Sequence, residues 1–425
     1  MADGPDERIS STTDGAPPRT FEDLLAEARA GAVQRERDRE LPFDLVRELL
    51  AAGFGRARIP VSAGGEGASL ETVFARLIEL AAADSNVAHV FRGHLAFVEQ
   101  QFFEPNAAVR DDWFRRVADG AFLGNAQSEL SNTSDLATTL TETPAGLVLN
   151  GRKFYTTGSI YADWIDLSAR FGDVDVQVIA PTGVPGVNSV DDWKGFGQKL
   201  TGSGTTTFVD VAIDPANVRQ NHDDEFKHPY MMGVFQLILL AVVAGIAQAA
   251  LDDAVAFVQP RRRIFGFGGE SLPRDNHLVQ SVVGDLSSAA FAARSMVLSA
   301  ARELGDALDE HLAGHGDPAR FLAAQLDVYK AQQLVLPIVV KATGDLFEVG
   351  GASAVDTDRA LDRHWRNART IATHNPAIHR KRAIGAWELN GTPPEWNIQA
   401  PPGDTEKPSG TEKPSESARP SESAK

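Results

Sequence analysis

A run of apolar residues from Met231 to Ala250 constrains the fold of this chain more than any other segment. The run is apolar almost all round and is interrupted by Gln236 and Gln248. A segment of this length could cross a membrane. Its flanks are polar, however, and 43% hydrophobic with 23% charged residues is an ordinary composition for a soluble protein. We therefore expect a helix at the centre of a bundle or at an oligomer interface.

Helical periodicity continues after this run and is also present near the N-terminus. In the N-terminal region Phe21, Leu24, Leu25 and Ala28 fall at helical spacing. After the apolar run the pattern predicts three further long helices. They cover roughly residues 276–304, 318–349 and 357–387. Together with the apolar run, they predict a four-helix bundle.

The middle of the chain has a different period. Residues 137–149, 166–180 and 205–213 are rich in Val, Ile, Thr and Phe with near-alternation, which predicts strands. No helical segments separate them, so a doubly wound parallel sheet is not expected. The dipeptide Asn150-Gly151 is typical of a hairpin turn. The strand after that turn would lead into residues 154–164, where three hydroxyl side chains and a glycine follow an aromatic pair.

These periods predict an α+β fold with three domains. They are an N-terminal helical domain (19–120), a central β domain (121–225) and a C-terminal bundle (226–398). Residues 1–18 and 399–425 are expected to be disordered. The net charge of −17 argues against binding to nucleic acid or to an anionic membrane. The absence of cysteine removes thiolate nucleophiles and cysteine-ligated zinc, and it fits a reducing compartment such as the cytoplasm.

Metal and dinucleotide sites are not indicated. The histidine pairs His89/His94 and His374/His379 are each five residues apart, a spacing that does not place both rings on one helical face. The glycine cluster at 266–269 lacks the last glycine of a dinucleotide fingerprint. We therefore expect no metal ion and no NAD(P)H site in this chain.

The order of these segments, with their motifs, resembles the acyl-CoA dehydrogenase superfamily over about residues 20 to 395. The matching motifs in chain order are Ile59-Pro60 with Gly64-Gly65, Ala83-Asp84-Ser85, Ser128-Glu129, Phe154-Tyr155-Thr156-Thr157-Gly158, Gly195-Phe196-Gly197-Gln198, Val209-Asp210-Val211, Leu346 to Gly351 and Arg369.

The resemblance implies two groups of flavin contacts. Strand ends of the β domain would hold the flavin ring, and the residues that line it would be Ser128, Thr156, Thr157 and Ser159. A glycine turn in the bundle would approach the tail of a flavin bound to a neighbouring subunit. This second group would consist of Arg262, Gly350, Gly351 and Ser353.

The chain departs from the dehydrogenase pattern where the catalytic base is expected. Acyl-CoA dehydrogenases use a carboxylate, usually in Glu-Gly-Thr, whereas residues 373–379 here read Thr-His-Asn-Pro-Ala-Ile-His. Without a base near the proton, general-base dehydrogenation cannot proceed. Asp345 and Glu348 belong to the cofactor-tail motif. A dehydrogenase with a displaced base and a flavin-binding protein without turnover remain alternatives.

His374, His94, Asn125 and Ser159 together resemble the flavin-dependent monooxygenase branch of the superfamily, which includes dibenzothiophene monooxygenase-like and dimethyl sulfone monooxygenase-like proteins. Such enzymes take reduced flavin from a separate NAD(P)H-dependent reductase and react it with O2 to a C4a-(hydro)peroxyflavin. Asn125 and Ser159 would supply neutral hydrogen bonds to it. His94 and His374 would move the proton, and Trp193 would form an apolar wall.

We expect the protein to form a homo-oligomer, with a tetramer as the first choice. It would bind FMN, with FAD possible, and oxygenate a small sulfur- or nitrogen-containing substrate.

The lack of a dinucleotide fingerprint gives a first prediction. The purified chain alone should not oxidise NADH efficiently, because it has no site for the nicotinamide nucleotide. The rate of NADH oxidation is measured from the NADH absorbance in the presence of FMN, once without and once with an added flavin reductase. Rapid NADH loss without the reductase would contradict the two-component interpretation.

Overall fold

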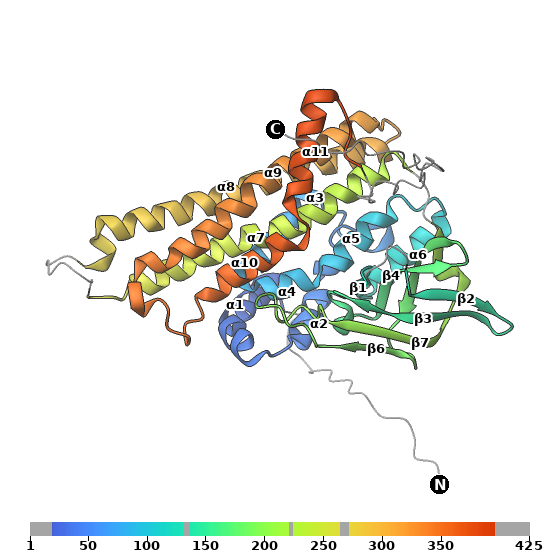
Figure 1. Cartoon of the computed structure of the whole chain (residues 1–425), viewed down its shortest axis with the longest axis horizontal. Coiled ribbons are helices and arrows are strands. Elements are labelled where there is room, and N and C mark those ends of the chain that lie inside the picture. Colours follow the sequence, from blue (N-terminus) through green and yellow to red (C-terminus); the bar gives the residue numbers. More distant parts are fainter. Residues whose placement is uncertain (1–18, 131–135, 221–223, 264–271, 396–425) are drawn as a thin grey trace, which may run out of the picture. The chain divides into compact units, whose positions relative to one another are not determined.

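The computed structural model describes residues 19–130, 136–220, 224–263 and 272–395. Within them a mixed sheet is followed and preceded by helices, so the expected α+β fold class is confirmed (Figure 1). The ends expected to be disordered, 1–18 and 399–425, lie outside the described residues.

The helices that precede the sheet fall within the expected N-terminal region. They are α1 (Phe21–Asp38), α2 (Phe43–Ala51), α3 (Leu70–Ala83), α4 (Ser85–Val90), α5 (Arg92–Gln101) and α6 (Ala107–Ala118). Asp84 begins α4 because its carboxylate accepts hydrogen bonds from the backbone N–H groups of Asn86 (2.9 Å) and Val87 (3.4 Å). Arg35 of α1 binds the same carboxylate at 2.8 Å. The start of α4 is therefore fixed from two sides.

The strands of the sheet have the order β6-β7-β3-β2-β4-β5-β8, and β1 pairs with β4 in parallel. Their bounds are β1 (Leu123–Ala126), β2 (Thr139–Thr143), β3 (Gly146–Phe154), β4 (Trp164–Phe171), β5 (Val174–Pro181), β6 (Val187–Val190), β7 (Thr205–Ile213) and β8 (Val218–Gln220). Alternate residues of β4 are buried, namely Ile165, Leu167 and Ala169. This alternation places one face of the strand in the sheet's own apolar core.

The hairpin turn expected at Asn150-Gly151 is wrong, because both residues lie inside β3 and the turn falls between Thr143 and Gly146. The register against β7 shifts at this dipeptide, as in a β-bulge. Asn150 uses its amide to bind Asp210 of β7 at 3.1 Å. Gly151 is required by packing, since a Cβ there would lie 2.5 Å from the Cα of Thr138.

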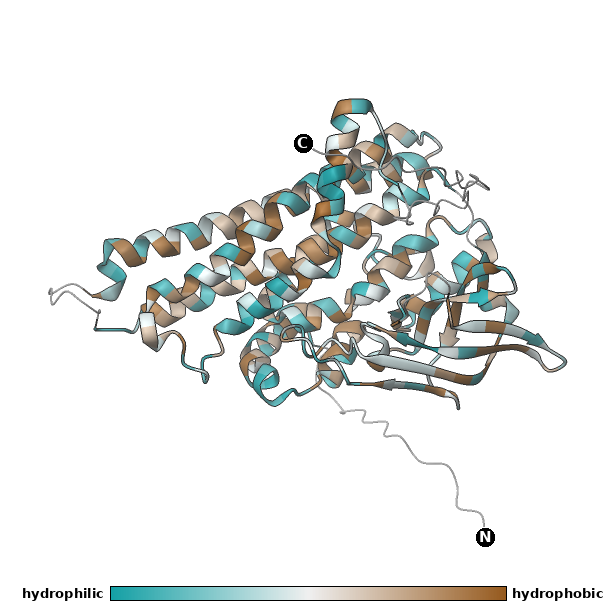
Figure 2. Ribbon diagram, viewed as in Figure 1, coloured by the Kyte–Doolittle hydropathy of each residue, from teal (hydrophilic) through white to brown (hydrophobic). Residues whose placement is uncertain are grey.

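The apolar run forms most of α7 (Lys227–Val258), the one helix among the described residues that is long and apolar enough to cross a membrane. In this fold 78% of its most apolar window is buried inside the protein. α3, α8 (His277–Leu312) and α9 (Pro318–Asp345) pack against it. Figure 2 shows α7 among these helices, with hydrophobic colours along most of its length. The expectation of a central bundle helix is confirmed, and α7 is a core helix of the bundle.

The fourth bundle helix, expected as one segment over 357–387, is divided into α10 (Asp362–His374) and α11 (Ala377–Asn390). Pro376 explains the break, because proline lacks an N–H and disfavours helical geometry in the residue before it. That residue, Asn375, is extended, with φ −123° and ψ 106°. The break leaves His374 as the last residue of α10.

The contact between α3 and α7 gives a prediction about stability. Gly245→Ala should lower the free energy of unfolding by about 1–3 kcal/mol, because the new Cβ would lie 2.4 Å from that of Ala81 and 2.6 Å from the carbonyl oxygen of Ile78. Urea unfolding measures the change.

Gly284→Ala in α8 is the matched control, since no atom lies within 4 Å of its added Cβ. Replacing a helical glycine there should raise stability by about 0.5–1 kcal/mol. Equal effects of the two substitutions would contradict the close packing of α7.

Candidate functional site

The candidate site begins where the ends of β1 and β3 meet the junction of α4 and α5. The backbone N–H of Asn125 donates to the carbonyl oxygen of Thr157 (3.3 Å), and Ser159 Oγ donates to the carbonyl oxygen of Asn125 (3.3 Å). Gly93 of α5 packs directly on Asn125, because a Cβ at this glycine would lie 2.9 Å from Asn125 Oδ1. The structure therefore brings Asn125 and Ser159 together, as the sequence predicted.

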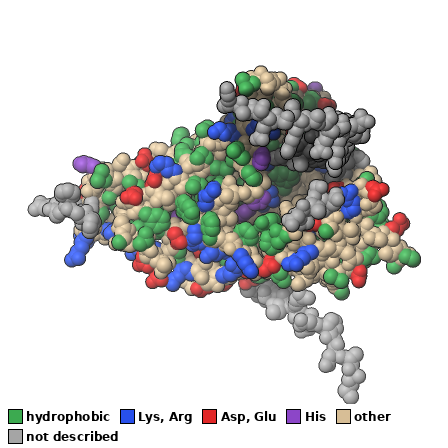
Figure 3. All heavy atoms as spheres, in the orientation of Figure 1, with side chains coloured by type: hydrophobic (Ala, Val, Ile, Leu, Met, Phe, Trp, Pro, Cys, Tyr) green, Lys and Arg blue, Asp and Glu red, His purple; other side chains and the backbone are tan. Residues whose placement is uncertain are grey.

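Two histidines lie close together on different helices. The ring of His89 on α4 lies 6.2 Å from the ring of His374, centroid to centroid. His374 Nδ1 lies 3.3 Å from Asn375 Oδ1, and the Asn375 amide donates to Gln236 of α7 at 3.0 Å. The extended Asn375 thus ties the end of α10 to the central helix. On the face drawn in Figure 3, histidine side chains reach the surface beside hydrophobic ones.

The electrostatics of the pair favour neutral rings. Burial, followed by the nearby Arg92 cation, lowers the pKa of His89 to about 4. Burial and Arg92 also lower the pKa of His374 below its ordinary value. The His374 side chain is nevertheless exposed to solvent. Both rings are neutral at pH 7.

Three buried polar atoms around the site lack a hydrogen-bond partner in the described part of the chain. They are Asn125 Oδ1, His89 Nε2 and Arg92 Nε. Unpaired buried polar atoms are rare in folded proteins, and each calls for a partner. A planar heteroaromatic ring with both donors and acceptors on its edge can supply such partners. The site therefore fits a flavin, and Asn125, Ser159, His89 and Arg92 are the residues that could contact it.

His94 has a different place from the one that the sequence suggested. It is fully buried, its Nε2 bonds the carbonyl oxygen of Gly55 (2.8 Å), and its Nδ1 accepts from the backbone N–H of Leu123 (3.3 Å). Both ring nitrogens are thus used by backbone groups, so a proton-transfer role for His94 is not supported. We replace His94 by His89 in the candidate site. Helical spacing did not separate the two because the helix breaks between them, at Phe91.

The predicted ring-lining threonines point their hydroxyls inward. Thr156 Oγ1 donates to the carbonyl oxygen of Gly204 (3.1 Å), and Thr157 Oγ1 lies 2.7 Å from Ser203 Oγ. They fix the segment before β7 to the strand end instead of presenting free hydroxyls. Ser128 is exposed, and its carbonyl oxygen accepts from Phe154 N–H at 2.9 Å.

Trp193 stands at the same strand end, as an apolar wall would require. Its indole lies 5.9 Å from the ring of Tyr155, with the two rings nearly edge to face. Trp193 Nε1 donates to the carbonyl oxygen of Gly197 at 3.0 Å, which fixes the indole. Tyr155 is 45% exposed. The pair forms a partly open aromatic surface beside the site.

The second predicted group lies at the opposite end of the bundle (Figure 1). Gly350 contacts the far end of α7, since a Cβ there would lie 2.2 Å from the ring of Phe257. From Gln236, which binds Asn375, α7 continues for 21 residues to Phe257, or about 31 Å. Within one chain this turn and the strand ends are too far apart to form one site.

The cation that contacts this turn within the same chain is Arg261. Arg261 donates to Ser353 Oγ at 3.3 Å and lies 4.5 Å above the ring of Phe257. Arg262, which the resemblance suggested, is exposed. Gly351 has a φ of +53°, a conformation that favours glycine. In the triple-arginine run, only the neighbour contacts could identify the residue that faces the turn.

Comparison with known proteins agrees with this architecture. The chain matches the family described as "Acyl-CoA dehydrogenase, N-terminal domain" over residues 19–121 and "Acyl-CoA dehydrogenase, C-terminal domain" over residues 237–377. The chain therefore belongs to the acyl-CoA dehydrogenase superfamily. Within it, the chain falls in the flavin-dependent monooxygenase branch, as the following relatives indicate.

A dibenzothiophene monooxygenase from Mycolicibacterium goodii is 28% identical over 402 residues, which cover 88% of this chain and 94% of the relative. A probable FMNH2-dependent monooxygenase, SfnC, from Pseudomonas putida is 28% identical over 381 residues, 86% of this chain and 90% of the relative. The crystal structure of FMN-bound TdsC from Paenibacillus sp. A11-2 superposes with a TM-score of 0.79 at 26% identity, covering 88% of this chain and 98% of that one.

The buried histidines predict how stability depends on pH. His89 and His94 each have a folded-state pKa of about 4, lowered mainly by burial, whereas the unfolded chain returns them to about 6.5. Between these values the unfolded state binds more protons. The free energy of unfolding should therefore be fully retained above pH 6.5. It should fall as the pH approaches 4, by up to about 3 kcal/mol per histidine.

Urea unfolding across this pH range measures the slope, and His94→Gln should make the slope shallower by removing one titrating group. The same variant should be less stable at pH 7, because it disturbs the bonds to Gly55 and Leu123. A stability that does not change between pH 6.5 and 4 would contradict the buried neutral rings.

Proposed function

We propose that this protein is the oxygenase of a two-component flavin-dependent monooxygenase. It takes reduced FMN from a separate NAD(P)H-dependent flavin reductase and uses O2 to oxygenate a small substrate. The observation that carries this proposal is the set of unpaired buried polar atoms on Asn125, His89 and Arg92, with the Asn125–Ser159 hydrogen bond and the His89–His374 ring pair beside them in support. FMN is favoured because one relative's name specifies FMNH2 and a similar structure holds FMN.

The flavin would supply the electrons that reduce O2, leaving one oxygen atom on the substrate and one in water. The protein's own part is to hold the ring and to manage a proton without adding charge. Asn125 and Ser159 offer neutral hydrogen bonds at the strand end. His89 and His374 are neutral at pH 7, so each can accept a proton, and neither brings a cation into the site.

The dehydrogenase alternative needs a carboxylate base at this place, and the one beside Asn125 is Asp166, its partner across β1 and β4. Among the described residues, no Asp or Glu is hydrogen-bonded to His89, His374 or Asn125. Asp345 forms an ion pair with Lys341 near the distant glycine turn. A base there is separated from the strand ends by the length of α7, so it cannot reach a substrate held beside them within the same chain.

The substrate class follows from oxygen-transfer chemistry and from the named relatives. An electrophilic oxygen reacts readily with soft lone pairs, which sulfur and then nitrogen provide. The M. goodii relative is named for a sulfur heterocycle. We assign a small, neutral and apolar sulfur compound as the first choice and a nitrogen compound as the second, with Tyr155 and Trp193 as the aromatic surface beside it.

The assembly in this proposal is a homotetramer in the cytoplasm. The glycine turn is about the length of α7 away from the strand ends of its own chain, and a second copy could bring it to a neighbour's strand end. Large apolar side chains on α8 support this, because Leu278 is 77% exposed and Phe291 is 74% exposed. The cytoplasm is where reductase, NAD(P)H and reduced flavin are available together.

His374→Ala tests the proposed function. Folding and FMN affinity should remain, while oxygenated product falls on the order of 10²-fold, the usual scale for loss of a positioned acid or base. Electrons from reduced FMN should then appear as hydrogen peroxide. Product from a panel of thioethers that includes dibenzothiophene, and peroxide from the same mixtures, are the measurements.

His379→Ala is the matched control, because this histidine is exposed on α11, five residues further along. It should keep the product yield of the unmodified protein. An unchanged yield in His374→Ala would refute the proposal. Bleaching of oxidised, protein-bound flavin by an acyl-CoA without oxygen would instead establish the dehydrogenase alternative.

A further inference from the structure

The chain between β6 and β7 packs closely against α10 at Gly197. A Cβ on Gly197 would lie 2.2 Å from the carbonyl oxygen of Arg366, so only glycine allows this approach. The Arg366 guanidinium donates to the carbonyl oxygen of Phe196 at 2.8 Å. The next residue, Gln198, has a φ of +51°, a strained conformation for a residue other than glycine. The chain thus holds Gln198 in place at a cost in backbone energy.

Gln198 is buried and connects three elements. Its backbone N–H donates to Asn367 Oδ1 of α10 at 2.6 Å. Its side-chain Nε2 donates to Ser85 Oγ at the start of α4, at 3.2 Å. Its Oε1 lies 3.0 Å from His89 Nδ1. One glutamine therefore links the helix of His374 to the helix of His89.

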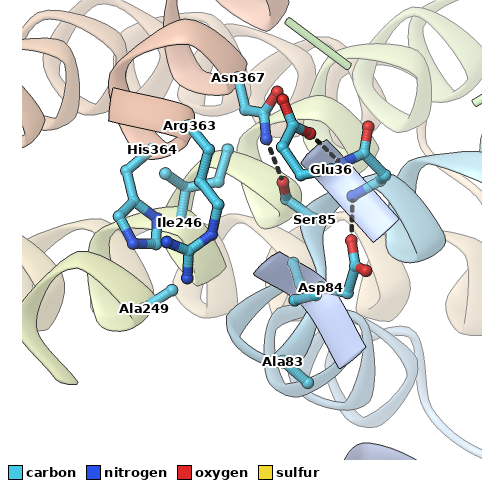
Figure 4. Close-up of a pocket in the computed structure, with 12 residues that line it drawn as sticks. Glu36, Ala83, Asp84, Ser85, Ile246, Ala249, Arg363, His364 and Asn367 are labelled. Atoms are coloured by element: carbon cyan, nitrogen blue, oxygen red, sulfur yellow. Dashed lines mark hydrogen bonds between the residues drawn. The ribbon is translucent and has the colours of Figure 1, made fainter. Parts of the chain in front are cut away.

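The orientation of the Asn367 side-chain amide follows from its contact with a backbone group. A backbone N–H can only donate, so the oxygen of Asn367 must face Gln198, and its nitrogen then faces Ser85 Oγ at 3.3 Å. Figure 4 shows Asn367 and Ser85 meeting beside a small polar cavity. In the structure the Gln198 side chain has Nε2 toward Ser85 Oγ and Oε1 toward His89 Nδ1.

The consequence falls on the protonation of His89. An amide oxygen only accepts, so Nδ1 of His89 carries the hydrogen that it donates to Gln198. His89 Nε2 is then a bare acceptor, and it is the atom left without a partner while the side chain is 3% exposed. The other groups that face His89 are Arg92 from α5 and His374 from α10.

We propose that Gln198 is a positioning residue for the monooxygenase reaction, which fixes the hydrogen of His89 on Nδ1 and presents Nε2 to the flavin and substrate. This inference rests on the proposed function. Asn367, which binds the Gln198 backbone, also belongs to the helix of the second histidine. It lies seven residues before His374 on α10, about two turns along the same face. The neutral amide is essential, since a carboxylate in its place would favour a charged imidazolium.

The first experiment measures the pKa of His89 in flavin-free full-length protein, by hydrogen–deuterium exchange at histidine C2 with mass spectrometry. Gln198→Glu should raise this pKa by one unit or more, because an acidic partner stabilises the protonated ring. Gln325→Glu is the matched control, a buried glutamine that bonds Tyr329 and no histidine. An unchanged His89 pKa in Gln198→Glu would overturn the proposal.

The second experiment reads the protonated nitrogen directly, from 15N spectra of histidine-labelled protein, with His89→Phe to assign the signal. The unmodified protein should show hydrogen on Nδ1. Ser85→Ala, a small change, frees the glutamine amide to rotate and should give a mixture of both forms. Hydrogen on Nε2 in the unmodified protein, or a single form unchanged in Ser85→Ala, would overturn the proposal even if the Gln198 variants do not fold.

Turnover separates this inference from the proposed function. Gln198→Leu should lower kcat about tenfold or more with little change in KM, and Gln198→Glu should shift the acid limb of the pH profile to higher pH. A kcat unchanged in Gln198→Leu would contradict the positioning role. Absence of oxygenation by the unmodified protein would refute the proposed function and leave the two measurements on flavin-free protein valid.

Discussion

The burial of α7 is the constraint on which the rest of the structure depends. A helix apolar on all sides must be covered on all sides, and α3, α8 and α9 do this in the described part of the chain. The two polar residues in its apolar run have partners. Gln248 binds Asp252, and Gln236 accepts from Asn375 and Gln332. The second set of bonds sets the position of the site, because Asn375 holds the end of α10.

The site is assembled from segments that are far apart in the sequence. Pro376 ends α10, so that His374 is its last residue. Asp84 caps the start of α4, the helix that carries His89. The strained Gln198 joins the two helices. Neutral groups predominate around the two rings, with Arg92 as the nearby cation. A site of this kind suits chemistry in which a proton moves while no carboxylate removes one from carbon. The same features distinguish it from a dehydrogenase site.

Period and composition were sufficient to predict the fold, because α7 and the strands each follow one pattern for many residues. Local rules failed where tertiary contacts decide. Asn150-Gly151 reads as a turn, but cross-strand bonds to Asp210 hold it within β3. Pro376 breaks the segment expected as one helix over 357–387, because proline lacks an N–H and disfavours helical geometry in the residue before it.

The site was predicted in part. The structure brings Asn125 and Ser159 together and places His374 beside His89, and their roles in flavin binding and proton transfer stay predictions. The sequence does not show which of His89 and His94 has a free ring nitrogen. That depends on the backbone groups of Gly55 and Leu123, which bond both ring nitrogens of His94. Gln198 was visible as part of a motif, yet its role depends on an amide orientation that only the folded network sets.

The central claim is that this site holds reduced flavin and directs its reaction with oxygen. The most direct test mixes protein and reduced FMN, prepared without oxygen, with oxygenated buffer in a stopped-flow spectrometer. An oxygenated flavin should persist far longer on the protein than in free solution and should disappear faster when a thioether substrate is added. Reoxidation at the rate of free FMN, with no such species, would contradict the central claim.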